Sequence, residues 1–149
     1  MKYKVLIISV LTSFLFACSG EKVEKEVVST YSNGNPIHEK YFKWVGNDEV
    51  LLREIRYYAT GAKESETEYN AEGKIHGKVI SWHDNEQKWL EETYENGIKN
   101  GVFIEWYKSG KKSFKGNYKD GLPDGKWIFW DENGKKISTK IYKNGEPVE

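Results

Sequence analysis

Residues 114–127 run Phe114-Lys-Gly-Asn-Tyr118-Lys-Asp-Gly121-Leu-Pro-Asp-Gly125-Lys-Trp127, and this stretch decides the fold. Phe114 and Tyr118 fall on one face of a period-two pattern, and the Asp120-Gly121 dipeptide follows them. Alternation with a period of two predicts β-strands, and Asp-Gly tolerates the positive φ angles that tight hairpin turns demand. The stretch therefore predicts a β-hairpin.

The same pattern recurs every 24 residues from Tyr57 onward. The recurring positions are Trp82, Trp106 and Trp130; Tyr94, Tyr118 and Tyr142; Gly73, Gly97 and Gly121; and Gly77, Gly101 and Gly125. Several residue types that stay in one phase indicate a repeat array. We expect hairpin repeats over residues 57–149 and a degenerate capping repeat over residues 31–56, because repeat arrays usually need an atypical end unit.

A single hairpin is unstable in water, so the hairpins must be stabilised by their neighbours. The sequence predicts an all-β protein, an elongated single antiparallel sheet of consecutive β-hairpin repeats of about 24 residues each. Turns are expected at Asn-Gly and Asp-Gly dipeptides, including Asn100-Gly101 and Asp124-Gly125, with strands that start after Gly77, Gly101 and Gly125.

The two faces of this sheet are expected to differ. We place the recurring Ile and Trp columns together with the Tyr column on one cohesive face. The other face drifts from copy to copy and gathers large apolar side chains towards the C-terminus, which a solvated sheet would not require. It supplies the predicted partner-binding patch, formed by Phe103, Tyr107, Trp127 and Phe129.

Composition limits the function classes. The 149 residues include 23 Lys and Arg against 23 Asp and Glu, so the formal net charge is zero. Bulk attraction to nucleic acid needs a basic surplus, and we expect no nucleic-acid partner. One Cys excludes an internal disulfide framework and a thiolate zinc cluster.

Residues 1–17 have the pattern of a processing signal. Lys2 and Lys4 precede an uncharged apolar run over residues 5–17, the pattern of a secretory signal peptide. The run is shorter than the roughly 20 apolar residues of a membrane-spanning helix. Leu15-Phe16-Ala17-Cys18 resembles the lipobox of bacterial lipoproteins, which implies cleavage before a lipidated Cys18. An ordinary signal peptide with an incidental Cys is the alternative.

Cleavage before Cys18 would leave a charged tether over residues 18–30. Acyl chains would anchor the protein, since each buried methylene adds about 0.8 kcal/mol to membrane affinity. The Ser that follows Cys18 resembles outer-membrane sorting in Gram-negative bacteria. We therefore expect a lipid-anchored protein of the bacterial cell envelope, at the outer membrane if the source is Gram-negative.

Residues 114–127 also resemble the MORN repeat, the membrane occupation and recognition nexus motif. The Gly-Lys-Lys elements that begin at Gly110 and Gly134 are similar to its bacterial variant, and the resemblance covers about residues 57–145. That variant is common in lipoproteins and in antitoxin-like proteins of toxin–antitoxin modules. The resemblance thus implies a protein partner, either a toxin or an envelope protein.

No catalytic, cofactor or metal site is predicted. Gly73-Lys-Ile-His-Gly77-Lys78 is one residue short of a phosphate loop, and its repetition at Gly121 assigns it to a turn. The three His residues lack a recurring acidic partner, and the run Glu64, Glu66 and Glu68 is typical of a half-solvated strand.

Two functional classes remain, both non-enzymatic. The preferred one is a membrane-anchored protein-binding module, since Trp and Tyr are enriched at binding hot spots. The alternative is an envelope glycan-binding module whose exposed Trp and Tyr stack on sugar rings. Burial of Trp89, Trp127 and Phe129 would remove the stacking platforms of the second class. A structural lipoprotein without a dedicated ligand is a third, less specific option.

Overall fold

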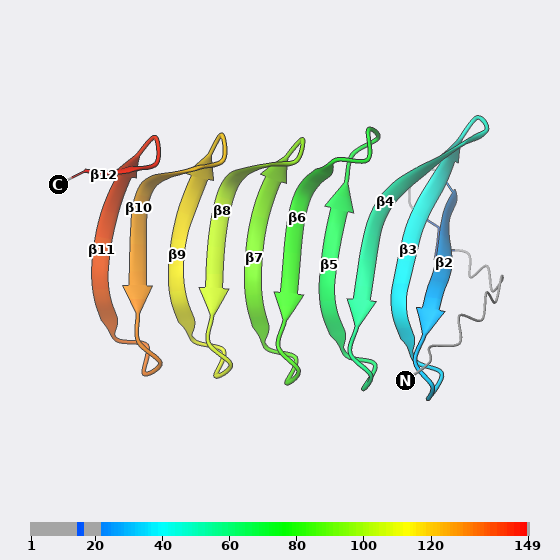
Figure 1. Ribbon diagram of the computed structural model, residues 1–149, viewed down its shortest axis with the longest axis horizontal. Helices are drawn as coiled ribbons and strands as arrows, with labels where there is room; N and C mark the ends of the chain where they lie inside the picture. The colour runs from blue at the N-terminus through cyan, green and yellow to red at the C-terminus, as the bar shows by residue number, and fades with distance from the viewer. Residues whose placement is uncertain (1–14, 17–21, 149) are drawn as a thin grey trace.

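A single antiparallel sheet of twelve strands forms the structure, a computed structural model that describes residues 15–16 and 22–148 (Figure 1). The strands are β1 (Leu15–Phe16), β2 (Lys22–Thr30), β3 (Pro36–Val45), β4 (Asp48–Tyr57), β5 (Lys63–Tyr69), β6 (Ile75–Trp82), β7 (Lys88–Glu95), β8 (Ile98–Trp106), β9 (Lys112–Lys119), β10 (Leu122–Trp130), β11 (Lys136–Lys143) and β12 (Glu146–Val148). They lie side by side in chain order. The prediction of an elongated sheet of consecutive hairpins is confirmed.

Tight two-residue turns join β7 to β8, β9 to β10 and β11 to β12 at one end of the sheet, as the sequence predicted, while residues 70–74 join β5 to β6 there. Asn96-Gly97, Asp120-Gly121 and Asn144-Gly145 adopt positive φ at both residues, 51° at each Asn or Asp and 82–87° at each Gly. Both central residues of a type I′ turn require this conformation. Each turn also bonds backward, because Gly97, Gly121 and Gly145 donate their N–H groups to the carbonyls of Ile75, Lys99 and Pro123.

The predictions of turns at Asn100-Gly101 and Asp124-Gly125 were wrong. Both dipeptides lie inside strands, β8 and β10, which begin three residues before the glycine. Gly101 (φ +122°) and Gly125 (φ +72°) lie at or beside irregularities in the strand register. Because the chain has already reversed at the preceding turn, these glycines accommodate β-bulges.

Five-residue loops at the opposite end of the sheet join the two strands of each hairpin, from β2 and β3 to β10 and β11. Tyr58 and Tyr107 donate their hydroxyls to the carbonyls of Trp82 and Trp130, at 2.7 and 2.8 Å. His83, the equivalent residue of the intervening copy, places Nε2 at 3.2 Å from the carbonyl oxygen of Trp106. The 24-residue period therefore positions Tyr58, His83 and Tyr107 to bond the following copy.

The sheet begins earlier than the predicted tether allowed. Residues 22–30 form β2, which pairs with β3 along its length. Lys25 of β2 bonds Glu39 of β3 at 2.9 Å, so charges in this segment pair across strands. The tether prediction therefore fails for residues 22–30. Cys18 lies outside the described residues.

The hydrophobic core is thin because the sheet has one layer. Within residues 22–148 the buried apolar side chains are Tyr41, Phe42, Ile55, Phe103 and Trp127. The other large apolar side chains there remain at least partly exposed. Among the described residues, no helix has the length and apolar character needed to cross a membrane.

Candidate functional site

Strand pairing assigns the recurring residues to two faces. Tyr94 pairs with Gly77 and Tyr118 with Gly101, while Phe103 pairs with Gly116. Directly paired residues project from the same side of an antiparallel sheet, and side chains alternate along each strand. The Tyr column therefore shares a face with Phe103 and Trp127. The prediction that it lies with the Ile and Trp columns was wrong.

We name these faces by their residues. The aromatic face is the side of β8–β11 that carries Phe103, Phe114, Tyr118, Trp127, Phe129 and Tyr142. The isoleucine face is the opposite side, which carries Ile55, Ile80, Ile104 and Ile128.

The six rings of the aromatic face form one continuous cluster. Phe103 stacks on Phe114 at 5.4 Å between ring centroids, and Trp127 lies 5.8 Å from Phe103. Tyr118 meets Trp127 edge-on at 5.2 Å. Tyr142 and Phe129 extend the cluster, 6.0 Å from Trp127 and 5.9 Å from Phe114 respectively. Each such pair contributes about 0.5–1.5 kcal/mol beyond area burial, so the rings hold the hairpins β8–β9 and β10–β11 together.

Trp127 lies flat on Gly116 at the centre of the cluster. A Cβ atom at position 116 would come within 2.2 Å of indole Cδ2, so only glycine leaves room for the ring. Trp127 is 6% exposed, and its Nε1 is buried with no hydrogen-bond partner. An unsatisfied buried donor costs about 1–3 kcal/mol. The centre of the aromatic face thus holds an N–H group that lacks an acceptor.

An ion pair borders the cluster on the side of β7. Glu92 is buried, accepts a hydrogen bond from the Tyr94 hydroxyl at 3.2 Å and pairs with Lys99 at 2.5 Å. The Lys99 ammonium lies 5.0 Å from the Phe103 ring centre and 5.1 Å from that of Tyr118. Burial alone would lower the pKa of Lys99, but the bond to Glu92 outweighs it and the pKa rises. Lys99 therefore remains a cation against the rings.

The four residues of the predicted partner-binding patch do not form one exposed surface. Phe103 and Trp127 are buried, at 8% and 6% exposure, and Phe129 is half-buried. Tyr107 lies in a loop, where its hydroxyl bonds the next hairpin. The prediction required all four side chains to be exposed for a partner, whereas Phe103 and Trp127 are buried among the other rings of this face. The half-buried rings of Phe114, Tyr118 and Tyr142 join Phe129 at its surface, and the prediction omitted them.

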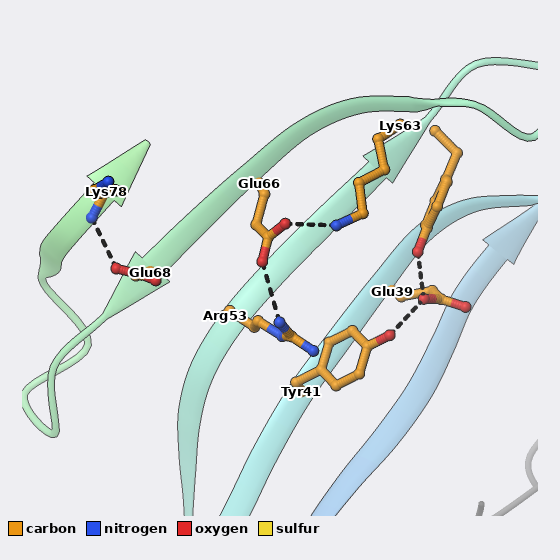
Figure 2. Close-up of polar contacts among 8 residues, drawn as sticks. Glu39, Tyr41, Arg53, Lys63, Glu66, Glu68 and Lys78 are labelled. Carbon is orange, nitrogen blue, oxygen red and sulfur yellow. Dashed lines mark hydrogen bonds and ion pairs between the residues drawn. The ribbon is translucent and has the colours of Figure 1, made fainter. Parts of the chain in front are cut away.

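The isoleucine face carries a polar network over β2–β6, part of which Figure 2 shows. Glu39 is buried and accepts hydrogen bonds from Lys25, Tyr41 and Tyr57 at 2.8–3.0 Å. Burial alone would raise the pKa of Glu39, but these three donors outweigh it and hold the pKa below its ordinary value. Burial followed by the bond to Glu39 raises the pKa of Tyr57. The network is saturated, which is typical of a structural role.

Ion pairs continue this network into the next strands. Arg53 and Lys63 both bond Glu66, at 3.1 and 2.7 Å, and the Arg53 guanidinium lies 4.2 Å from the Tyr41 ring centre (Figure 2). Glu68 accepts the backbone N–H of Lys78 at 2.8 Å. The sequence prediction for Glu64, Glu66 and Glu68 was a half-solvated strand, and it included no ion pairs. The signal for the pairing was the recurrence of Lys three residues before Glu, at Lys63–Glu66 and Lys88–Glu91.

The three histidines are separated in the structure. His38 packs against Glu54 at 3.4 Å, His83 bonds the following hairpin, and His76 lies near the Asn96 turn. Within residues 15–16 and 22–148, no group of three His, Cys, Asp or Glu side chains could hold a metal ion.

Comparison with protein-family models agrees with the hairpin period. Residues 75–96, 99–120 and 123–144 match the model of the MORN repeat variant. The three matching segments follow one another along the chain. Each one spans a hairpin that begins on an even-numbered strand, from β6 to β11. MORN repeats commonly act as protein- or membrane-binding modules and are typically non-catalytic. The chain matches no curated protein.

Proposed function

We propose that this protein is a non-catalytic binding module whose aromatic face captures a protein partner. One observation carries the proposal: six aromatic side chains gather on one side of a single-layer sheet, around the unpaired Nε1 of Trp127. Tyr, Trp and Phe are the residues enriched at the centres of protein interfaces. Because Nε1 of Trp127 is buried, a partner would contact the outer edges of the rings around it.

The site differs from the predicted patch in its contact residues. Phe114, Tyr118, Phe129 and Tyr142 are half-buried and offer their outer edges to a partner, while Phe103 and Trp127 support them from within. Lys140 lies 5.9 Å from the Phe129 ring centre and adds a positive charge at the border. The partner surface that fits is apolar at its centre and carries a negative charge opposite Lys140.

The anchor completes the proposal. We infer that Cys18 is lipidated, because the only Cys of the chain follows an apolar run in a lipobox-like context. The module would then work at the bacterial cell envelope, and the partner would be a toxin or another envelope protein, as in antitoxin or immunity proteins. Fatty-acid labelling of cells tests the anchor. The native chain should incorporate the label and Cys18→Ala should not. Label that persists in Cys18→Ala would contradict the lipidation of Cys18.

A glycan partner is the second candidate, favoured by the exposed indoles of Trp44 and Trp89, at 52% and 46%. Trp44 is in β3 and Trp89 in β7, and neither belongs to the aromatic cluster. Burial of Trp127 removes one of the three platforms considered for sugar stacking, so the protein partner is preferred.

Affinity capture tests the proposed site. The full chain is immobilised and exposed to envelope extract, next to Phe129→Ser and Ile128→Ser variants. These neighbouring residues are both half-buried but project from opposite faces of β10. Loss of one defined protein with Phe129→Ser, and its retention with Ile128→Ser, supports the proposal. Equal capture by all three chains counts against it, and retention of glycan alone supports the second candidate.

A further inference from the structure

The zero net charge of the chain conceals two regions of opposite charge. Residues 22–97 contain ten Lys and Arg against fifteen Asp and Glu. Residues 98–148 contain eleven Lys against six Asp and Glu. The structure places these regions at opposite ends of the sheet, with the boundary between β7 and β8 (Figure 1). A charged partner would therefore respond to the charge of the region that it contacts, and not to the zero net charge of the chain.

The repeats supply an internal comparison on the isoleucine face. Glu66 pairs in the ladder with Ile55 and Ile80, and Glu91 pairs with Ile80 and Ile104. Each of these carboxylates bonds the lysine three residues before it, at 2.7 Å. On the isoleucine face of β5 and β7, a glutamate of the same copy therefore neutralises the charge of each of these lysines.

In the next copy, the residue at the position of Glu66 and Glu91 has the opposite charge. Lys115 pairs with Ile104 and Ile128, so it occupies the place of Glu66 and Glu91. Lys112 keeps the place of Lys63 and Lys88 but has no carboxylate three residues ahead. Lys119 and Lys126 lie on the same face of β9 and β10. Within residues 22–148, none of these four exposed lysines forms an ion pair.

We propose that this lysine patch, Lys112, Lys115, Lys119 and Lys126, docks an acidic segment of a protein partner. The half-buried Ile104 and Ile128 lie between the lysines on the same face, and Asp124 is the carboxylate of β10 that shares it. Side chains on one face of a strand recur about every 6.5–7 Å, so an extended segment that alternates acidic and apolar residues matches this surface. The patch lies on the opposite side of the sheet from the aromatic face. Its role as a docking site is therefore independent of the proposed function.

Charge reversal at the patch gives a test in which unfolding is not expected. Lys115→Glu restores the Lys-x-x-Glu pairing of the earlier copies, so the K115E/K126E variant should keep the melting temperature of the native chain. The matched control is K135E/K140E, which carries the same charge change in a loop and on the aromatic face. The probe is a short fluorescein-labelled peptide that alternates Glu and Val, and fluorescence anisotropy measures its binding to the full chain.

The native chain is expected to bind the Glu-Val peptide with an affinity that falls as the salt concentration rises. It should show no binding to a Lys-Val peptide. K115E/K126E should weaken binding about tenfold or more, and K135E/K140E and Phe129→Ser should leave it nearly unchanged. Equal weakening by both double variants would overturn the proposal. Binding to heparin or to phosphatidylglycerol vesicles without binding to the peptide would also overturn it, by assigning the patch to another class of partner.

Discussion

Gly116→Ala tests how closely the aromatic face is packed. The new Cβ would lie 2.2 Å from Cδ2 and 2.3 Å from Cε2 of Trp127. Ordinary carbon contacts need about 3.5–4.0 Å, so the indole must move by about 1.5 Å. Overpacking of this kind costs about 1–3 kcal/mol, and the displaced ring weakens contacts with Phe103, Tyr118 and Tyr142 that are worth about 0.5–1.5 kcal/mol each. We expect a loss of about 3 kcal/mol in the free energy of unfolding.

A double-mutant cycle separates this cause from a backbone effect. In a Trp127→Ala background the Cβ meets no indole, and Gly116→Ala should be neutral or stabilise by up to about 1 kcal/mol, because glycine in a strand is entropically unfavourable. The coupling energy is then about 3 kcal/mol. Urea unfolding of the four chains, followed by far-ultraviolet circular dichroism, measures it. The same change in unfolding free energy in both backgrounds would refute the packing argument.

Three further predictions concern the array. Glu86 has φ +65° where Gly110 and Gly134 occupy the equivalent loop position, so Glu86→Gly should stabilise the chain by about 1 kcal/mol in thermal melts; an unchanged or lower melting temperature contradicts this. The folded pKa of Glu39 is lowered, so its charge stabilises the fold above the ordinary value of 4.5, and this is lost as pH falls through the folded pKa. The deficit of Glu39→Gln in urea midpoints should therefore shrink at acidic pH, and a constant deficit contradicts it. Trp106→Ala in the middle of the array should destabilise more than Tyr142→Ala near its end, since truncated packed aromatics cost about 3–5 kcal/mol and end positions lose fewer neighbours; equal denaturant midpoints count against the stacked hairpins.

The sequence was sufficient to predict the hairpins because period and turn chemistry are local properties. The 24-residue spacing of Trp82, Trp106 and Trp130 defines the repeat, and Asn96-Gly97 or Asp120-Gly121 supplies the positive φ that the turn needs. These signals depend on residues that are close in the chain, so no knowledge of packing was required.

The assignment of faces failed because it depends on register across strands. Alternation shows which residues of one strand share a side, but the bulge near Gly101 changes how β7 aligns with β8. One residue of shift moves a whole column to the other face. The Tyr column was therefore placed opposite Phe103 and Trp127, and the cluster that they form together was missed.

The N-terminal strand was missed for a different reason. Residues 22–26 are mostly charged, which is typical of a solvated tether. In the structure Lys25 reaches the buried Glu39, so a carboxylate on a later strand recruits the segment into the sheet. The composition of residues 22–30 alone does not indicate that Lys25 pairs with Glu39 on the next strand.

Site-specific photocrosslinking tests the central claim, that the aromatic face holds a protein partner. A photoreactive phenylalanine analogue is placed at Phe129 or, as the control, at Ile128 on the opposite side of the same strand, and cells that express the full chain are irradiated. A covalent adduct with one defined protein is expected from position 129, and none from position 128. An adduct from position 128 alone, or from neither position, would contradict that claim.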